Sequence, residues 1–205
     1  MHRDVAKFAS QMFYDGKLEA VPLEHQTEEI RQCEEVTQID TLLNRSRMVM
    51  IDVKPTEEDQ LKIDNANVAE AEAVAEVFSS ILRREGEKFS NESTVGIIVP
   101  YRSQISAIRR EIERRCGECY SDVVIDTVER FQGSQREYII YSTTVKRYSQ
   151  LKFLSASRFV ENDIIIDRKL NVALTRTRSH TIIVTNRALI SRDPIYRELC
   201  KACTL

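Results

Sequence analysis

Two arginines at the end of a short apolar stretch are the side chains in this sequence best suited to phosphate chemistry. Residues 168–178 read R-K-L-N-V-A-L-T-R-T-R, with an apolar spine that ends just before Arg176 and Arg178. A guanidinium group is always charged, and its fork of N–H donors matches phosphate oxygens. An arginine held beside a packed element can therefore stabilise charge in phosphoryl transfer. The alternative is a helix end with solvated arginines, and the pattern alone favours that alternative.

A second stretch makes a role in phosphate chemistry more favourable than solvated arginines. Residues 126–137 read D-T-V-E-R-F-Q-G-S-Q-R-E. In order and spacing, the two stretches resemble motif V (F-Q-G-x-E) and motif VI (N-V-A-L-T-R-A-R) of superfamily 1 helicases. The resemblance is greatest to the 5′-to-3′ branch, which includes the nonsense-decay RNA helicase and related DNA repair helicases. A third segment, V-P-Y-R-S-Q at 99–104, resembles the family's T-P-Y-x-x-Q motif.

The elements that must position these motifs alternate between strand and helix. Apolar runs predict strands, and amphipathic stretches predict helices capped by Asn65 or Asn67 and by Ser103. This alternation favours an α/β fold with a mainly parallel β-sheet flanked by helices on both faces. The runs that predict strands are 48–53, 95–100, 123–125, 138–143 and 180–185.

The resemblance implies a RecA-like second motor domain of the P-loop NTPase type, without the P-loop itself. We expect this domain to cover residues 48–205, with residues 1–47 as a connecting segment packed on it and residues 146–167 as a partly ordered insert. Met1 and His2 match the end of the family's Q-Y-R-M-H motif, whose arginine is absent here. We therefore expect the chain to be part of a longer protein.

A phosphate-cradling loop is missing from the sequence. None of the five glycines lies in a G-x-x-x-x-G-K-S/T pattern, and no strand ends in a magnesium-binding D-E pair. The resemblance implies that the first motor domain of the same polypeptide holds these parts, together with most contacts to ATP and Mg²⁺. We expect the chain to supply half of a composite ATP site and to be inert alone.

The resemblance also assigns residues to that half-site. Arg176 is implied to be the catalytic arginine finger, which reaches the γ-phosphate of ATP across the cleft between motor domains. Gly133 and Gln135 are implied to contact the nucleotide. The family has glutamate where Gln135 stands, and glutamine keeps the hydrogen-bonding reach but loses the charge. Arg178 is expected to have a packing or ion-pair role.

Single-stranded DNA or RNA is the implied partner. A tyrosine after a strand can stack on a base, and an arginine beside it can meet a phosphate; the alternative for the tyrosine is a core-capping role. The sequence V-E-R-F-Q-G-S-Q-R-E resembles bacterial DNA helicases, which favours DNA over RNA as the partner. The residues implied to contact nucleic acid are Pro100, Tyr101, Arg102, Thr127 and Thr143.

The charge is unevenly distributed. Residues 1–90 carry 11 Lys+Arg against 19 Asp+Glu, a net of -8, whereas residues 91–205 carry 19 against 13, a net of +6. The basic half holds the helicase-like motifs, as expected if it faces phosphates. No apolar run is long enough for a membrane span, so we expect no membrane partner.

Five cysteines exclude a fully paired disulfide framework, and we expect reduced thiols in the cytoplasm. Two C-x-x-C pairs, 116–119 and 200–203, make a Cys₄ zinc site conceivable. Their wide separation in sequence, and the helix-like setting of the second pair, favour unliganded cysteines instead.

Two other functions compete with a helicase motor. The chain can be a nucleic-acid-binding module that has lost motor activity, with Gln135 as a sign of that loss, or an α/β protein-interaction module. The presence of both Arg176 and Gly133 favours the motor.

Overall fold

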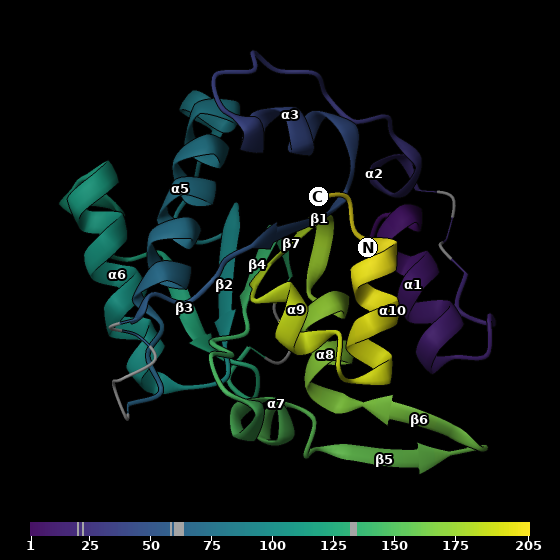
Figure 1. The fold of residues 1–205 in the computed structure, drawn as a ribbon. Coiled ribbons are helices and arrows are strands. Elements are labelled where there is room, and N and C mark those ends of the chain that lie inside the picture. Colours follow the sequence, from purple (N-terminus) through teal and green to yellow (C-terminus); the bar gives the residue numbers. More distant parts are fainter. Residues whose placement is uncertain (20, 22, 58, 60–63, 132–134) are drawn as a thin grey trace.

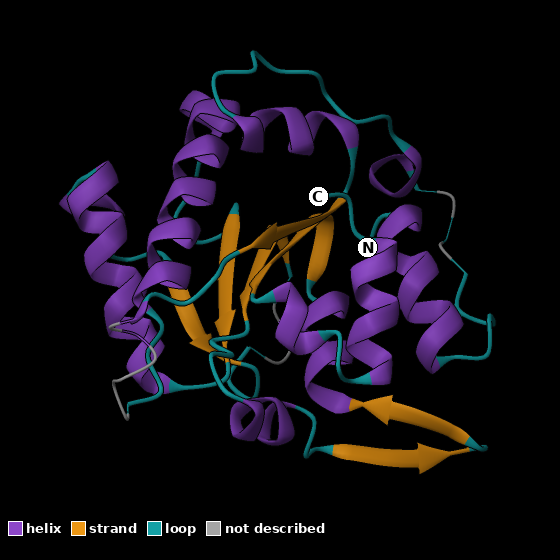
Figure 2. Ribbon diagram, in the orientation of Figure 1, coloured by secondary structure: helices purple, strands orange, loops and turns teal. Residues whose placement is uncertain are grey.

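A parallel β-sheet forms the centre of the molecule (Figures 1 and 2). The computed structural model describes residues 1–19, 21, 23–57, 59, 64–131 and 135–205. Within those ranges the larger sheet has five strands in the order β1-β7-β4-β2-β3, with every neighbouring pair parallel. This confirms the predicted α/β fold. The strands are β1 (Met48–Asp52), β2 (Val95–Val99), β3 (Val124–Thr127), β4 (Arg136–Ser142) and β7 (Thr177–Thr185).

Helices cover both faces of the sheet (Figure 1). One face carries α3 (Gln38–Arg45), α5 (Val68–Glu85) and α6 (Arg102–Cys116). The other face carries α1 (Arg3–Phe13), α7 (Tyr148–Leu154), α8 (Arg168–Thr175), α9 (Arg187–Ile190) and α10 (Pro194–Ala202). The remaining elements in the described ranges are α2 (Glu24–Thr27), the short 3-10 helices η1 (Gly86–Lys88) and η2 (Glu118–Tyr120), and the antiparallel hairpin of β5 (Arg158–Glu161) and β6 (Ile164–Asp167).

The strands divide the apolar side chains between two cores because successive residues of a strand point to opposite faces. In β4, Tyr138 and Ile140 join the core under α3, α5 and α6, which we call the α5 core. Ile139 and Tyr141 join the core under α1, α8 and α10, which we call the α8 core. Helix α1, although it lies within the first 47 residues, buries Phe8 and other apolar side chains in the α8 core.

The observed helix caps agree only in part with those predicted from the sequence. Of the two candidates Asn65 and Asn67, Asn67 caps α5 by accepting a hydrogen bond from the Glu70 backbone N–H. The prediction that Ser103 caps α6 is wrong, because α6 begins two residues earlier than such a cap requires and Tyr101 is its N-cap residue. Tyr101 makes no side-chain capping bond, so its ring remains available for other contacts.

Two segments are more regular than predicted. Residues 146–167 form α7 and the β5–β6 hairpin rather than a partly ordered insert. The hairpin turns at Asn162 and Asp163, which both have positive φ angles of 49° and 63°; such residues suit a two-residue turn between antiparallel strands. Strand β7 begins at Thr177 instead of His180, so Arg178 is part of the sheet.

Gly96 is required in β2 by a close approach of the chain. A Cβ atom at this position would lie 2.5 Å from Cζ of Phe131 and 2.9 Å from Cγ of Arg136. Phe131 is only 1% exposed and has little room to move. Overpacking of this kind is destabilising, so Gly96→Ala should lower the free energy of unfolding by about 1–3 kcal/mol.

Denaturant unfolding of the variant measures this effect. As a control, Phe131→Leu should cost less in the Gly96→Ala background than in the parent, because the shorter side chain relieves the clash. Equal stability of Gly96→Ala and the parent would show that the packing of Phe131 on β2 is looser than described.

Among the described helices, none combines the length and the apolar composition needed to cross a membrane.

Candidate functional site

Helix α8 is the element that positions Arg176. Its N-cap residue Asp167 accepts a hydrogen bond at Oδ1 from the Leu170 N–H, at 3.1 Å. Arg158 Nε lies 3.2 Å from Oδ2 of the same buried carboxylate. Burial nevertheless raises the pKa of Asp167, against the lowering effects of Leu170 and Arg158. Leu170 and Leu174 are fully buried in the α8 core, so a cap and packing together hold the helix in place.

Arg176 is the C-cap residue of α8, and its guanidinium rests on its own helix. Nε donates to the Val172 carbonyl at 3.4 Å, and Nη2 donates to Thr175 Oγ1 at 3.3 Å. Both bonds are long and therefore weak. The side chain is half-buried, and among the described residues no carboxylate forms an ion pair with it. The helix thus sets the position of Arg176 and leaves its charge available.

The residues that follow the F-Q-G stretch meet Arg176 through the backbone. The N–H of Arg136 donates to the carbonyl of Arg176 at 3.0 Å, and Arg136 lies opposite Thr177 in the register of β4 and β7. Gln135 directly precedes β4 and is exposed. Gln135 and Arg176 are therefore neighbours at the amino ends of β4 and β7, an edge that we call the nucleotide edge. Gly133 lies outside the described residues.

An ion pair and the start of the chain border the nucleotide edge. Arg178 Nη1 lies 3.3 Å from Glu137 Oε1, which is the kind of contact expected for Arg178. The backbone N–H of His2 donates to the Arg178 carbonyl at 2.8 Å. Burial, and then the positive charge of Arg47, lower the pKa of the buried His2 ring. Met1 and His2, which match the end of the Q-Y-R-M-H motif, therefore lie beside the motif VI stretch at 168–178.

The residues expected to contact nucleic acid lie at the opposite end of the sheet. Val99 and Thr127 are register partners in the parallel pair of β2 and β3, so the carboxyl ends of these strands meet. Pro100 and Tyr101 follow β2 directly and are partly buried, while Arg102 is exposed in the first turn of α6. Thr143 directly follows β4, which is parallel to β2, so all five residues gather at one edge of the sheet.

Tyr101 belongs to an aromatic stack that sequence reasoning missed. Its ring stacks on Phe153 of α7, with centroids 4.9 Å apart and planes at 20°. Lys169 Nζ, from the first turn of α8, lies 4.0 Å from the centroid of the Phe153 ring. Phe153 remains 46% exposed. We call Tyr101, Phe153 and Lys169 the aromatic platform; its missed members come from distant parts of the chain and match no motif singled out in the sequence.

Thr143 differs from the other four in its burial. It is fully buried, and its Oγ1 lies 2.7 Å from Thr185 Oγ1 and donates to Glu70 at 3.5 Å. Its hydroxyl therefore does not face solvent in this structure. Glu70 also accepts hydrogen bonds from Ser142 Oγ at 2.7 Å and from the Thr144 N–H at 2.8 Å. A role for Thr143 at the nucleic acid would have to act through the position of its neighbours.

The two C-x-x-C pairs lie on different faces of the sheet. Cys116 packs against the α5 core, while Cys200 and Cys203 belong to the α8 core. All five cysteines are free thiols. The residues that the structure describes contain no cluster of three or more His, Cys, Asp or Glu side chains that could hold a metal ion.

Comparison with known proteins identifies the family. A family model described as an AAA domain matches residues 1–188. Helicase sen1 of Schizosaccharomyces pombe is 30% identical over 200 residues, which cover 97% of this chain and 11% of the relative. Putative helicase MOV-10 of Gallus gallus is 29% identical over 98% of this chain and 21% of the relative.

An uncharacterised ATP-dependent helicase of Methanocaldococcus jannaschii is 28% identical over 98% of this chain and 28% of its own length. The chain thus spans between 11% and 28% of the length of these three relatives. The match extends over the parallel sheet, the F-Q-G stretch and helix α8. The chain belongs to the superfamily 1 helicases, within which it is a C-terminal RecA-like domain.

Proposed function

We propose that this chain is the second motor domain of an ATP-dependent helicase that acts on single strands of DNA or RNA. The observation that carries the proposal is the arrangement at the two ends of the sheet. At the nucleotide edge, Arg176 is positioned by its helix, and no carboxylate of the described part of the chain neutralises it. At the other end, the aromatic platform presents rings and a lysine.

Arg176 fits the role of an arginine finger for an ATP molecule whose phosphates are cradled by another domain. Its guanidinium can approach the γ-phosphate and neutralise charge that develops there. Gln135, next to it, can donate or accept a hydrogen bond to the nucleotide through its amide. Glu137 does not compete for Arg176, because it pairs with Arg178.

Mg²⁺ fits this chain less well than the nucleotide does. The metal prefers carboxylates and phosphate oxygens in octahedral geometry. Glu137 at the nucleotide edge is engaged by Arg178, and the described residues offer no cluster of metal-binding side chains. We therefore assign the protein ligands of Mg²⁺ to the P-loop domain of the same polypeptide.

Helix α8 connects the two ends of the sheet. Lys169 of the aromatic platform stands in its first turn, and Arg176 caps its last turn. A helix of this length extends only about 12 Å, so the same rigid element contacts both edges. A rotation of the domain that moves Arg176 toward or away from ATP would therefore carry Lys169 with it, which couples the cleft to the strand.

The test of this proposal is binding of labelled single strands, measured by fluorescence anisotropy at several salt concentrations. We expect weak binding that weakens as salt rises, because backbone phosphates supply most of the attraction. Lys169→Ala should reduce the slope of log K against log salt by about 0.7, the value for one phosphate contact on a single strand. Tyr101→Ala should cost about 1–3 kcal/mol if its ring stacks on a base.

Lys201→Ala is the matched control, since Lys201 is exposed on α10 and pairs with Glu198 away from the platform. Parallel titrations with DNA and RNA of the same sequence establish which strand is preferred. Equal effects of Lys169→Ala and Lys201→Ala would remove the platform from the proposal, and salt-insensitive binding would contradict a groove that follows the backbone.

A further inference from the structure

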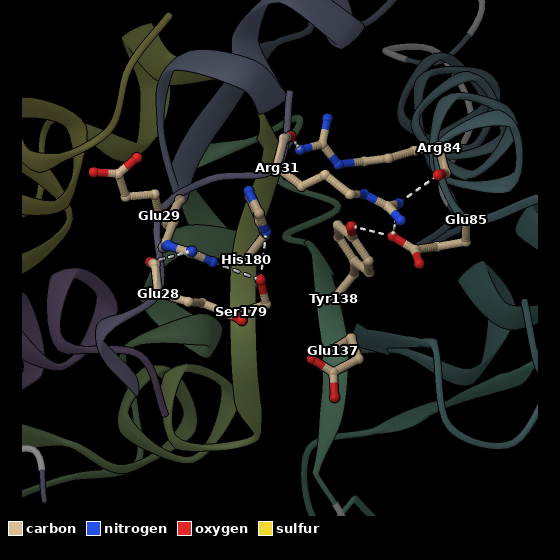
Figure 3. Close-up of a pocket in the computed structure, with 10 residues that line it drawn as sticks. Glu28, Glu29, Arg31, Arg84, Glu85, Glu137, Tyr138, Ser179 and His180 are labelled. Atoms are coloured by element: carbon tan, nitrogen blue, oxygen red, sulfur yellow. Dashed lines mark hydrogen bonds and ion pairs between the residues drawn. The ribbon is translucent and has the colours of Figure 1, made fainter. Parts of the chain in front are cut away.

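A cavity beside the nucleotide edge has no role in the function proposed above. It has a volume of about 240 Å³ and lies between the segment around Arg31, the end of α5, and strands β4 and β7 (Figure 3). Its inner wall includes two arginines, Arg47 and Arg84, together with His180. We call it the Arg47 cavity. It is smaller than pockets that enclose drug-sized ligands, which measure roughly 300–1,000 Å³.

Both arginines are buried and have only neutral partners. Arg47 and Arg84 are 3% and 8% exposed. Arg47 donates from Nη1 to Ser179 Oγ at 2.7 Å and from Nη2 to the backbone carbonyl of Glu28 at 2.8 Å. Arg84 donates from Nη1 to Asn44 Oδ1 at 2.8 Å. Among the described residues neither guanidinium has a carboxylate in an ion pair, although a buried charge without a counter-charge is costly.

Arg47 also has a donor with no partner. Its Nε is buried and makes no hydrogen bond within the described structure. Buried N–H groups are almost always paired, so an orphan at a cavity wall indicates a missing acceptor. The acceptor has to be small, because the other two nitrogens of Arg47 are already fixed by Ser179 and Glu28.

The carboxylates near the cavity do not fill this need. Glu85 accepts hydrogen bonds from Arg31 Nη2 at 2.9 Å and from the Tyr138 hydroxyl at 2.6 Å. Glu137 pairs with Arg178. Figure 3 shows the carboxylate of Glu29 directed away from His180 and Arg31. Glu28 also lines the cavity, and its negative charge acts on Arg47 through space. Among the described residues, however, no carboxylate is in contact with either guanidinium group of the inner wall.

His180 is neutral and adds no charge of its own. Burial, and then the nearby Arg47 and Arg84, lower its pKa to about 3. Its ring stacks on Tyr138 at 5.2 Å, with planes at 16°. Nδ1 lies 2.8 Å from Ser179 Oγ and Nε2 lies 3.3 Å from the Leu43 carbonyl, so the imidazole fixes the hydroxyl that holds Arg47. The stack and this chain of bonds make the cavity wall rigid.

We propose that the Arg47 cavity binds a phosphate-sized oxyanion, either free orthophosphate or the terminal phosphate of a nucleotide. A phosphate group carries about 1.5–2 negative charges at neutral pH, and the two guanidinium groups of the inner wall can contact it directly because no carboxylate occupies them. Guanidinium donors suit its oxygens in number and geometry. Glu137 and Ser179 of the cavity lie two and three residues from Gln135 and Arg176, so the site adjoins the nucleotide edge without including it.

The first measurement is thermal unfolding of the chain as sodium phosphate replaces sodium chloride at constant ionic strength. A ligand that binds only the folded state raises the unfolding temperature as its concentration rises. We expect a saturable rise for the parent and for Arg45→Gln, because Arg45 is exposed in the same segment and lies outside the cavity. Arg47→Gln should weaken phosphate binding at least about tenfold, since it removes the orphan donor and one charge.

Without phosphate, Arg47→Gln should be no less stable than Arg45→Gln, because the substitution removes a buried charge that no carboxylate contacts. Arg84→Gln, titrated in the same way, keeps the test decisive if Arg47→Gln fails to fold. The parent should show the same saturable response whether or not Arg176 is replaced by alanine, so the cavity is tested independently of the arginine finger.

A second measurement distinguishes free orthophosphate from the phosphate of a nucleotide. Adenosine, adenosine monophosphate and adenosine diphosphate are titrated by calorimetry against the parent and Arg47→Gln. Orthophosphate binding that depends on Arg47 supports a site for the free ion, whereas binding of the phosphorylated nucleosides alone, with the same dependence, supports a nucleotide phosphate. A response of equal size in Arg47→Gln, Arg84→Gln and the parent, or no response at all, overturns the proposal.

Discussion

Replacing Arg176 with alanine should lower kcat for ATP hydrolysis by about 10³–10⁵-fold in a polypeptide that contains this domain together with its P-loop domain. Arg176 is held by Val172 and Thr175 of its own helix before any ligand arrives. Its charge acts only when charge develops on the γ-phosphate, so the affinity for ATP should change much less than kcat. Steady-state kinetics combined with nucleotide binding separates the two effects.

Two variants sharpen this prediction. Arg176→Lys keeps the charge but loses the planar fork and should restore activity only in part. Arg178→Ala is the control, because Arg178 pairs with Glu137 in an exposed ion pair, and such pairs contribute little to stability. If Arg176→Ala kept kcat within a few-fold of the parent while Arg178→Ala abolished it, the finger would have been assigned to the wrong arginine.

Replacing Glu70 with alanine should destabilise the domain by at least about 3 kcal/mol. Glu70 is fully buried and accepts hydrogen bonds from Asn67 Nδ2, Ser142 Oγ and the Thr144 N–H. Each donor left without a partner costs about 1–3 kcal/mol. Thr144 depends on this carboxylate most, because its φ of 57° is unusual for a β-branched residue. Denaturant unfolding measures the loss.

Glu70→Gln tests the charge of the same side chain. Burial raises the pKa of Glu70 from 4.5 to about 8. Between these values the folded state holds a proton that the unfolded state has released, so stability falls as pH rises toward about 8. Glutamine has no such proton, and the variant should gain stability relative to the parent over this range. Unfolding temperatures that keep a constant difference from about pH 5 to pH 8 would show that Glu70 is ionised in the fold.

The sequence predicts the sheet and its helices because each strand is a continuous apolar run. Val95–Val99, for example, is buried at all five positions and reads as apolar throughout. The start of β7 escapes prediction because Thr177, Arg178 and Ser179 are polar, although Thr177 is fully buried. Thr177 lies within hydrogen-bonding distance of Thr181, and the apolar pattern of the sequence does not reveal this contact.

The candidate sites also divide into residues that a local sequence pattern reveals and residues that only tertiary contacts bring together. Motif spacing alone brings Gln135 and Arg176 into consideration, and the parallel register then makes them neighbours. Phe153 escapes prediction because its stacking on Tyr101 depends on the path of α7. The Arg47 cavity joins α5, β4, β7 and the segment around Arg31, so no stretch of sequence contains enough of it to suggest a site.

The most direct test of the account is ATP hydrolysis by the purified chain, with and without a single strand, beside a polypeptide that also carries the P-loop domain. We expect no turnover by the chain alone under either condition, because the chain has Arg176 but no phosphate-cradling loop. Turnover should appear in the longer polypeptide, rise with the single strand and depend on Arg176. Clear turnover by the chain alone that is lost in Arg176→Ala would contradict the division of the ATP site between two domains.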